Sequence, residues 1–498
     1  MKIMPDALPP LITALLDPAC YPDAGKEVHL IETHASWVLL AGAFAYKIKK
    51  PITLPFLDYG SLTRREHFCR AELRLNQRLA ATLYLDVLPI GGHPDAPRLG
   101  ELPAIEWAVR MRRFDEQGRL DRVARRGELM PVHLSQLAAT LFDFQTSAAI
   151  ADPRFGTPEL ILSAATENFA ELRDLLPSPL QPELAQLARW TNGEFALRRE
   201  VMLARQKNGR VRECHGDLHL GNLVLIGDQV TPFDCIEFNE EFRWIDVASE
   251  MAFLWVDLLD HRQPGLAAWL LNAWLEHSGD FQALEVFRFY AVYRAMVRAK
   301  VAALSKNVDD AGNYLALASR IAVPPAPTIT LTCGVSGSGK TTASSARILD
   351  SSLPAAGTLI RLRSDIERKR LFGLHALQSS GSALDGGIYT TQATERTYCR
   401  LEQLSRQLIS GRWPVIVDAA FLLHSERTRF RALADELGIA FQIVNTTATI
   451  DELQRRIQSR RGDASEATVA VLKRQLGWFE PLDEAERACV IHPDNQGI

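Results

Sequence analysis

Residues Gly334 to Thr341 carry the feature that most constrains this chain, the complete pattern G-x-x-x-x-G-K-[ST]. The run before it, Thr328–Cys333, is short, β-branched and apolar, as expected of a buried parallel strand. The residues after the loop are compatible with a helix. Strand, glycine-rich loop and helix start thus come in the order that lets backbone N–H groups surround phosphate oxygens at a helix N-terminus. The pattern predicts that the chain binds a nucleoside triphosphate.

The loop residues are expected to divide the work of phosphate binding. The glycine-rich backbone closes around phosphate oxygens, Lys340 reaches the outer phosphates during transfer, and Thr341 holds Mg²⁺. ATP with Mg²⁺ is therefore the expected cofactor. The residues predicted to contact the nucleotide here are Gly334, Ser336, Gly337, Ser338, Gly339, Lys340, Thr341 and Thr342.

Composition bounds what else the chain does. At 498 residues, with 47% hydrophobic and 23% charged side chains, it has the make-up of a globular protein of two or three domains. A net charge of −4 gives no electrostatic footprint for nucleic acid or an anionic membrane, and no apolar stretch is long enough to span one. Seven cysteines without a C-x-x-C pair, and a start without an export signal, lead us to expect a cytoplasmic protein with reduced thiols.

Residues 36–49 are predicted to form a strand whose two faces differ. Small residues share one face with Lys47 and Lys49, which leaves room for a flat ligand beside an ammonium group. An edge strand with solvated lysines is the alternative. The helix predicted over residues 66–79 places Glu72 within an apolar stripe, where a carboxylate needs a cationic partner. We expect that partner to be Lys47, and the pair to orient phosphates.

A second polar constellation follows at residues 215–238. It includes Asp217 and Asn222, and a predicted hairpin then returns the chain so that Asp234 lies beside them. Two acids and an amide that converge at the base of a hairpin form an oxygen-rich Mg²⁺ site and leave one acid as a base.

This segment resembles the catalytic loop of aminoglycoside phosphotransferases and related small-molecule kinases, which have H-G-D-x-x-x-x-N where protein kinases have H-R-D-x-x-x-x-N. The resemblance covers roughly residues 25–310 and is most specific at 215–238. It implies that Asp217 accepts the proton of the substrate hydroxyl and that Asn222 and Asp234 hold metal. The lysine and glutamate described above would then be the phosphate-orienting pair.

Two features depart from the protein-kinase pattern. No G-x-G-x-x-G precedes the lysine strand, and Glu237 stands third after Asp234, where D-F-G is absent. A chain that keeps the fold and has lost the chemistry is the alternative. Asp246 and Glu250, at the start of a predicted helix, are interpreted as structural acids rather than metal ligands.

Three prolines between residues 324 and 327 cannot continue a helix and predict a boundary near residue 324. Residues 1–323 are expected to form one domain and residues 324–498 another. Beyond the phosphate loop, residues 413–418 are predicted to form a buried strand that ends in Asp418, an acid placed to support Mg²⁺ coordination.

A further strand, predicted over residues 357–363, leads to Asp365 and Arg368. Asp365 is a candidate base and Arg368, one helical turn on, is a candidate ligand of substrate or phosphate. A capped helix start with solvated charges is the alternative. The helix from Ile450 carries arginines expected to close over phosphates, namely Arg455, Arg456, Arg460 and Arg461, with Arg456 and Arg460 at the nucleotide; a solvated helix face is the alternative there.

The second half resembles the P-loop kinases close to polynucleotide 5′-kinases, gluconate kinases and zeta-toxin-like enzymes, over nearly all of residues 328–490. The order of the two halves resembles bacterial fusions of an aminoglycoside phosphotransferase with an AAA-type ATP-binding protein. The fold expected is therefore α/β in two domains. The first is a bilobal protein-kinase-like (α+β) fold, and the second is a P-loop NTPase with a parallel sheet flanked by helices.

The expected function is ATP- and Mg²⁺-dependent phosphoryl transfer to small-molecule hydroxyls at two nucleotide sites. One alternative is an N-terminal pseudokinase or sensor domain that regulates a single P-loop kinase. Another is a kinase of nucleic-acid ends, which the acidic net charge disfavours. These motifs are shared by kinases of many acceptors, so they single out neither an acceptor, aminoglycosides included, nor an oligomeric state.

Overall fold

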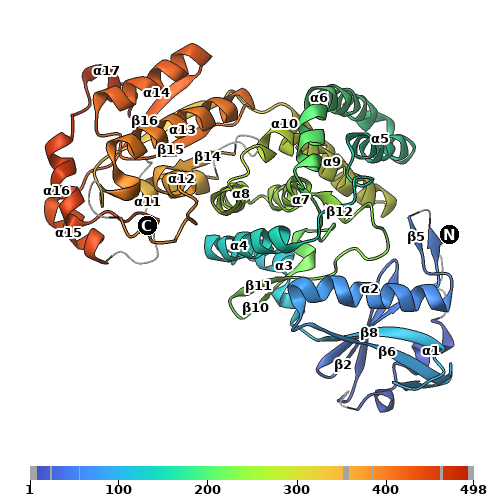
Figure 1. The fold of residues 1–498 in the computed structure, drawn as a ribbon. Coiled ribbons are helices and arrows are strands. Elements are labelled where there is room, and N and C mark those ends of the chain that lie inside the picture. Colours follow the sequence, from blue (N-terminus) through green and yellow to red (C-terminus); the bar gives the residue numbers. More distant parts are fainter. Residues whose placement is uncertain are drawn as a thin grey trace. The chain divides into compact units, whose positions relative to one another are not determined.

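The chain forms two compact units in the computed structural model (Figure 1). Unit 1 comprises Met1–Leu129, Asp143–Thr157 and Arg205–Glu250, and unit 2 comprises Met130–Phe142, Pro158–Ala204 and Met251–Ile498. Within the described part of the chain, no helix combines the length and the apolar character that crossing a membrane requires. The structure describes residues 8–22, 25–54, 56–351, 358–382, 386–459 and 464–491.

Unit 1 contains a six-stranded antiparallel sheet. In spatial order its strands are β1 (Val28–Glu32), β2 (Ser36–Ala41), β3 (Phe44–Lys49), β8 (Glu106–Arg112), β6 (Tyr84–His93) and β7 (Ala96–Leu99). Lys47 pairs with Val38 on one side and with Val109 on the other, so β3 is a central strand. The alternative of an edge strand with solvated lysines is therefore wrong.

The single strand predicted over residues 36–49 is also wrong, because a turn divides it into β2 and β3. Gly42 has a φ of +55°, which glycine adopts without steric cost, and the chain reverses there. The predicted alternation holds within β3. Tyr46 and Ile48 belong to one buried cluster, whereas the two lysines reach the acids described below.

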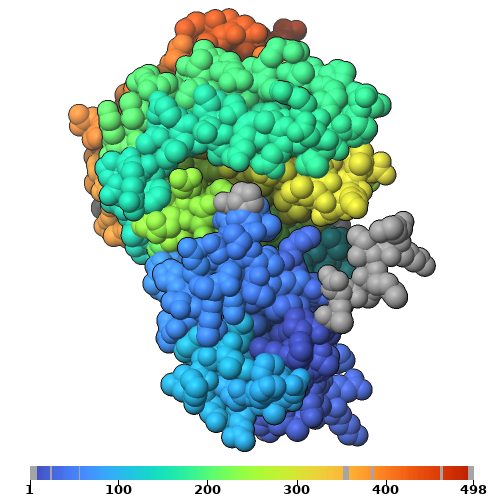
Figure 2. All heavy atoms as spheres, turned by 90° about the vertical axis from the view of Figure 1, so that its right-hand side faces the viewer, coloured from blue at the N-terminus to red at the C-terminus, as the bar shows by residue number. Residues whose placement is uncertain are grey.

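The helix α2 (Leu62–Ala80) packs against strands of this sheet, and both belong to the blue surface in Figure 2. Its start is capped by Ser61, whose hydroxyl accepts a hydrogen bond from the Arg64 N–H. It contributes to a buried cluster that includes Cys69, Ala80, Tyr84, Trp107 and Val109. The helix predicted over residues 66–79 is thus present and begins four residues earlier.

The rest of unit 1 carries the second polar segment. β9 (Val211–Glu213) pairs with β12 (Trp244–Asp246), and β10 (Leu223–Ile226) with β11 (Gln229–Pro232) forms the predicted hairpin. Shorter elements are α1 (Pro10–Ala14), β4 (Thr53–Leu54), β5 (Leu57–Asp58) and α3 (Leu120–Arg125). An antiparallel sheet with one helix, followed by a loop, a hairpin and helices, is the order of elements of the predicted kinase-like fold.

Helices dominate the first part of unit 2. α5 (Pro158–Leu175), α8 (Pro264–Ser278), α9 (Ala283–Leu304) and α10 (Val308–Ala322) lie in it, and α4 (Pro131–Ser147), α6 (Gln181–Lys207) and α7 (Val247–Asp260) are shared between the units along the chain. The aromatic stripes of this region form core, as predicted. Phe287 stacks edge-on against both Trp255 and Trp413, with ring centroids 5.6 and 6.0 Å away.

The second part of unit 2 is a four-stranded parallel sheet, in agreement with the predicted P-loop fold. Its order is β14 (Ile360–Arg363), β15 (Val415–Asp418), β13 (Thr328–Cys333) and β16 (Ala440–Asn445). β13, β14 and β15 are almost entirely buried, because helices cover both faces of such a sheet. These helices are α11 (Lys340–Leu349), α12 (Ser364–Leu371), α13 (Thr391–Ser410), α14 (His424–Leu437), α15 (Ile450–Ser459), α16 (Val469–Trp478) and α17 (Glu484–Arg487).

α8 and α9 contact this parallel sheet within unit 2. The side chain of Asn272 donates to the Leu359 carbonyl at 2.8 Å and accepts from the Arg361 N–H at 2.6 Å, along the free side of β14. The Trp413 indole donates to the Leu284 carbonyl at 3.1 Å. Unit 2 therefore extends across residue 324, and the division into residues 1–323 and 324–498 stays a prediction about functional domains.

Candidate functional sites

The phosphate loop connects β13 to α11, whose first residue is Lys340. Two of its glycines are required by close backbone approach. A Cβ on Gly334, at a φ of +150°, would lie 2.5 Å from the Thr446 carbonyl oxygen, and one on Gly337, at a φ of +83°, would lie 2.8 Å from the Leu453 carbonyl oxygen. The loop thus adopts a conformation that side chains at these positions would prevent.

Polar groups of the loop contact oxygen atoms of the protein itself. The Lys340 ammonium donates to the carbonyls of Gly334 at 2.8 Å and Val335 at 2.9 Å. The N–H of Ser336 donates to Oε1 of Gln475, on α16, at 2.6 Å. Ser338 shares a hydrogen bond of 2.8 Å with the Thr446 hydroxyl. Oxygen atoms of the protein therefore occupy the donors that the oxygen atoms of a phosphate group would contact.

The predicted magnesium ligands of this site lie on two neighbouring elements. Thr341 and Thr342 are in the first turn of α11, and Asp418 ends β15 with only 6% of its surface exposed. Oδ2 of Asp418 accepts a hydrogen bond of 2.9 Å from Ser344, one helical turn after Thr341. A hydroxyl and a carboxylate beside a phosphate loop are hard oxygen donors, so the residues present fit Mg²⁺.

Arg361 connects this acid to α8, a contact that no local sequence pattern predicted. Its guanidinium donates to the Ser345 hydroxyl at 2.8 Å and to Oε1 of Glu276 at 2.8 Å. A third hydrogen bond, of 3.4 Å, goes to Ser344, the residue that also contacts Asp418. Hydrogen bonds thus run from a helix of the first half to the predicted magnesium ligand of the second.

The arginines predicted to close over the phosphates differ in their positions. Arg456 on α15 donates to the Gly337 carbonyl at 3.3 Å, so it lies beside the phosphate loop. Arg455 is exposed and pairs with Glu452 at 3.6 Å. Arg460 and Arg461 lie outside the described residues. Arg456 is therefore the member of this group that the structure brings to the loop.

Asp365 and Arg368 both lie on α12, as predicted. Arg368 is buried and donates to the Ile388 carbonyl at 3.0 Å and the Thr394 hydroxyl at 3.1 Å, with the Tyr389 ring centroid 5.3 Å from its guanidinium. It holds the start of α13 through these contacts. Its role toward a substrate, and that of Asp365 as a base, stay predictions.

The predicted ion pair of the kinase-like region is present in unit 1. Lys47 Nζ lies 2.8 Å from Oε1 of Glu72 and 2.5 Å from Oδ1 of Asp234. Glu72 is fully buried, whereas the Asp234 side chain is 42% exposed. Asp234 has a φ of +66°, and its N–H donates to the Tyr84 hydroxyl at 3.1 Å. The lysine therefore joins the helix acid to the predicted metal ligand.

A second lysine extends this cluster beyond what the sequence predicted. Lys49, only 1% exposed, lies 2.7 Å from Oε2 of Glu72 and also pairs with Glu237. Glu237 accepts a further hydrogen bond from the Tyr59 hydroxyl. Lys49 and Lys47 share a face of β3, so the sequence predicts that both side chains point in the same direction. The pairing with Glu237 could not be predicted, because Glu237 lies 188 residues away from Lys49 along the chain.

Opposing effects set the ionisation of this cluster. Burial alone would raise the pKa of Glu72, but Lys47 and Lys49 outweigh it and lower that pKa to about 2. Burial likewise lowers the pKa of Lys47, whereas Asp234 and Glu72 raise it to a final value well above the usual range. The lysine is thus held as a cation, the form that binds phosphate.

The predicted catalytic loop is held together by its own side chains. The Asn222 amide donates to Oδ2 of Asp217 at 2.9 Å and to the Asp217 carbonyl at 3.0 Å, and His219 Nε2 lies 3.4 Å from the same carboxylate. The His215 ring contacts the Phe233 carbonyl at 2.9 Å, which ties this loop to the residue before Asp234. Asp217, Asn222 and Asp234 thus belong to one connected segment.

Asp246 and Glu250 have structural contacts, as interpreted from the sequence. Arg205 donates to both carboxylate oxygens of Asp246 at 2.8 Å. Glu250 accepts from the His215 N–H at 2.5 Å and from the Gln145 amide at 2.8 Å. Glu250 therefore anchors the start of the predicted catalytic loop.

Residues 329–482 match a protein-family model described as an AAA domain. This span includes the phosphate loop and the residues Asp365, Arg368, Asp418 and Arg456. The match agrees with the resemblance of the second half to P-loop proteins.

Curated relatives span most of the chain. An uncharacterized protein of Mycobacterium tuberculosis (strain H37Rv) is 29% identical over 465 residues, which cover 90% of this chain and 90% of the relative. An uncharacterized protein of Mycobacterium bovis matches to the same extent. The similarity therefore reaches across both halves.

Solved structures resemble part of the chain. A choline kinase from Cryptosporidium parvum Iowa II is 11% identical with a TM-score of 0.40, and the match covers 62% of this chain and 94% of that one. A choline/ethanolamine kinase family protein from Mesorhizobium loti is 11% identical with a TM-score of 0.40, covering 63% and 94%. The GDP complex of an aminoglycoside 2′-phosphotransferase-IIIa is 12% identical with a TM-score of 0.38, covering 62% and 97%.

Proposed function

We propose that this chain is an ATP- and Mg²⁺-dependent phosphotransferase that acts on small-molecule hydroxyls and has two nucleotide sites. The observation that carries the proposal is the phosphate loop. Gly334 and Gly337 bend its backbone, Lys340 stands at the start of α11, and Asp418 contacts the same helix through Ser344. Nucleic acid and membrane are not the expected partners. Both are anionic, and a chain with a net charge of −4 has no overall electrostatic attraction to them.

At the phosphate loop the chain supplies position and charge. The Lys340 ammonium exchanges its two carbonyl contacts for phosphate oxygens. The N–H groups of the loop also donate to phosphate oxygens. Mg²⁺, held by Thr341 and Asp418, neutralises charge on the phosphates when it is bound. Asp365 is the proposed base for the acceptor, and Arg368 and Arg456 are the proposed arginine contacts.

At the second site, Asp217 is proposed to accept the proton of a substrate hydroxyl. Asn222 orients that carboxylate through the hydrogen bond of 2.9 Å, so its oxygen is held for the incoming hydroxyl. Lys47, fixed by Glu72, is proposed to bind the phosphates. Asn222 and Asp234 offer oxygen donors that fit Mg²⁺.

A regulatory role of the first half is the second candidate. The hydrogen bonds of Asn272 and Glu276 on α8 with Leu359 and Arg361 favour it, because they join a helix of residues 1–323 to the P-loop sheet. In that case the first half binds a nucleotide or metabolite and controls one active kinase.

The test uses the full chain and three variants, Asp217→Ala, Lys340→Ala and the double variant. ATP consumption is measured with Mg²⁺ across a panel of small hydroxyl compounds, and MgADP stoichiometry is measured by calorimetry. We expect two moles of nucleotide per chain and two acceptor-dependent activities, each lowered about 100-fold or more by one of the single substitutions.

The outcomes separate the two candidates. If Lys340→Ala abolishes all turnover and Asp217→Ala removes none, the regulatory role replaces the two-enzyme proposal. If the folded chain binds no magnesium nucleotide at all, the proposed function is wrong in both forms.

A further inference from the structure

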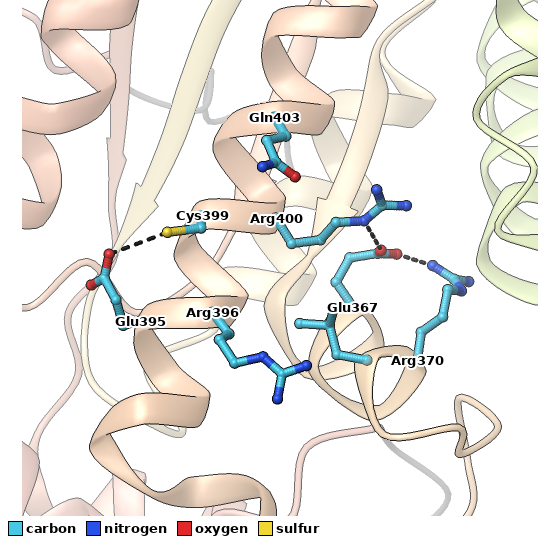
Figure 3. A pocket seen from close by; sticks show the side chains of 8 residues that line it. Glu367, Arg370, Glu395, Arg396, Cys399, Arg400 and Gln403 are labelled. Carbon is cyan, nitrogen blue, oxygen red and sulfur yellow. Dashed lines mark hydrogen bonds and ion pairs between the residues drawn. The ribbon is translucent and has the colours of Figure 1, made fainter.

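A cavity of about 470 Å³ lies between α12 and α13 in unit 2 (Figure 3). None of the residues proposed above for nucleotide, metal or proton transfer lines it. Its charged and polar lining consists of Glu367 and Arg370 from α12 with Glu395, Arg396, Cys399, Arg400 and Gln403 from α13.

Two arginines of this cavity have uncommitted donors. Arg396 makes no ion pair among the described residues, and its guanidinium lies 5.4 Å from the ring centroid of Phe372. Arg400, one turn further along α13, contacts Glu367 through Nε at 3.7 Å, and its two terminal nitrogens point away from that carboxylate (Figure 3). Both arginines leave the same side of α13, and Figure 3 shows their guanidinium groups at different ends of the cavity, that of Arg400 beside Glu367 and that of Arg396 turned away from it.

The third arginine keeps the cavity in shape. Arg370 donates to the Glu276 carbonyl at 2.8 Å and the Leu275 carbonyl at 3.3 Å, at the end of α8, and pairs with Glu367. Glu367 thus stands between two arginines, in close contact with Arg370 and 3.7 Å from Arg400. The wall of the cavity is therefore formed by charged groups that already hold one another.

Positive charge exceeds negative charge at this place. Three arginines line the cavity, Arg370, Arg396 and Arg400, with two acids, Glu367 and Glu395. Glu395 also pairs at 2.9 Å with Arg429, which does not line the cavity. Burial lowers the pKa of Arg370 to about 10 and also lowers that of Arg400, so the folded protein compensates these cations incompletely. A bound anion would supply the missing negative charge.

We propose that this cavity binds a small organic phosphate monoester. The phosphate group contacts the free donors of Arg400, and the exposed side chain of Arg396 turns toward it, because a dianion matches two guanidinium forks. The volume exceeds that of a phosphate group alone and leaves room for a compact organic part beside Leu371. The two glutamates restrict the site to a ligand with one anionic end. This site is independent of the function proposed above.

The test follows the reactivity of Cys399, a half-buried thiol of the lining. The full chain is held in saturating MgADP to fill nucleotide sites, and glycerol 3-phosphate is the probe. Alkylation by iodoacetamide is quantified by peptide mass spectrometry at Cys399 and, as internal standards, at the half-buried Cys20 and Cys489. Glycerol and sodium chloride at matched ionic strength are the control additions.

We expect glycerol 3-phosphate to slow alkylation of Cys399 with saturation. At roughly four times the dissociation constant the reduction is about fivefold, because only the free cavity reacts. Cys20 and Cys489 keep their rates. The double variant Arg396→Gln/Arg400→Gln loses the protection, whereas Arg406→Gln keeps it, since that arginine lies on α13 outside the cavity and pairs with Glu436 at 2.6 Å.

Two results would overturn the proposal. One is an unchanged rate at Cys399 in the wild-type chain at every probe concentration. The other is equal protection in the wild-type chain and the double variant. If the double variant unfolds, the single variant Arg396→Gln replaces it, because that side chain is exposed and its loss leaves no buried charge.

Discussion

The ammonium group of Lys49 lies 2.7 Å from Glu72, the same acid that Lys47 contacts at 2.8 Å. Each oxygen of the Glu72 carboxylate thus has its own lysine. This arrangement fixes the orientation of the acid and, through it, the position of Lys47.

Lys49→Met is expected to lower the free energy of unfolding of the chain by about 3 kcal/mol or more. It leaves Glu237 and Glu72 buried with fewer cationic partners, which is far more costly than breaking a surface pair. Urea denaturation measures the change. Lys50→Met is the matched control, because Lys50 pairs with the exposed Glu32 and the loss of such a pair changes stability little. Equal effects of the two substitutions would contradict the prediction.

The stability contributed by Glu72 is expected to depend on acid pH. The folded-state pKa of about 2 lies below the ordinary value of 4.5, so this contribution is complete above pH 4.5 and is lost as the pH falls toward 2. Glu72→Gln should therefore destabilise the chain by about 3 kcal/mol at pH 7, and the difference from wild type should shrink below pH 4.5.

Chemical denaturation of both proteins between pH 3 and pH 7 checks this. Glu66→Gln, on the same helix, removes an exposed pair with Arg70 and should show a small difference at all pH values. A gap between wild type and Glu72→Gln that stays constant down to pH 3 would speak against the ionised acid.

Gln475→Ala is expected to strengthen nucleotide binding at the phosphate loop. Its side-chain oxygen lies 2.6 Å from the Ser336 nitrogen and competes with a phosphate oxygen for that N–H. Removing a hydrogen bond of about 1 kcal/mol should raise the affinity of one MgADP site about fivefold, as measured by calorimetry. Lys473→Ala, an exposed residue of the same helix, should leave affinity unchanged. A weaker site in the Gln475 variant would show that the side chain supports nucleotide instead.

Asn272→Ala is expected to destabilise unit 2 by about 2 kcal/mol. It leaves the Arg361 N–H and the Leu359 carbonyl without their side-chain partner in a buried position. Thermal unfolding compared with Asn192→Ala checks this, since the exposed Asn192 amide contacts only its own helix, at the Ala188 carbonyl. If the two variants melt together, the contact adds nothing to stability.

The sequence predicts those parts of the sites that local rules determine. The strand, loop and helix around Lys340 follow one another without a break, so the loop could be recognised from its pattern alone. The contact between Lys47 and Glu72 could be predicted because strand and helix periods place both on inward faces, and an acid in an apolar stripe requires a cation. The hairpin before Asp234 was likewise readable.

The features that the sequence did not reveal depend on residues far apart in the chain. The two-residue turn at Gly42 and Ala43 shifts the alternation by one residue, so that Leu39 rather than Leu40 packs with Tyr46, and a single alternating pattern over residues 36–49 missed it. Glu237 and Gln475 carry no local pattern, and only the tertiary fold brings them to Lys49 and Ser336. The contacts of Arg368 with Ile388 and Thr394 could not be predicted either, because those residues lie 20 and 26 positions away along the chain.

The hydrogen bonds of Asn272 with Leu359 and Arg361 bear on how this gene can be divided. Backbone donors and acceptors on the outer border of a parallel sheet recruit other chains when they are left bare, and here a helix from the first half occupies that border. A fragment that begins at residue 324 would uncover it and invite aggregation. Gene fission would succeed only where both products are made together and remain bound, so co-expression, rather than separate purification, is the way to obtain the halves.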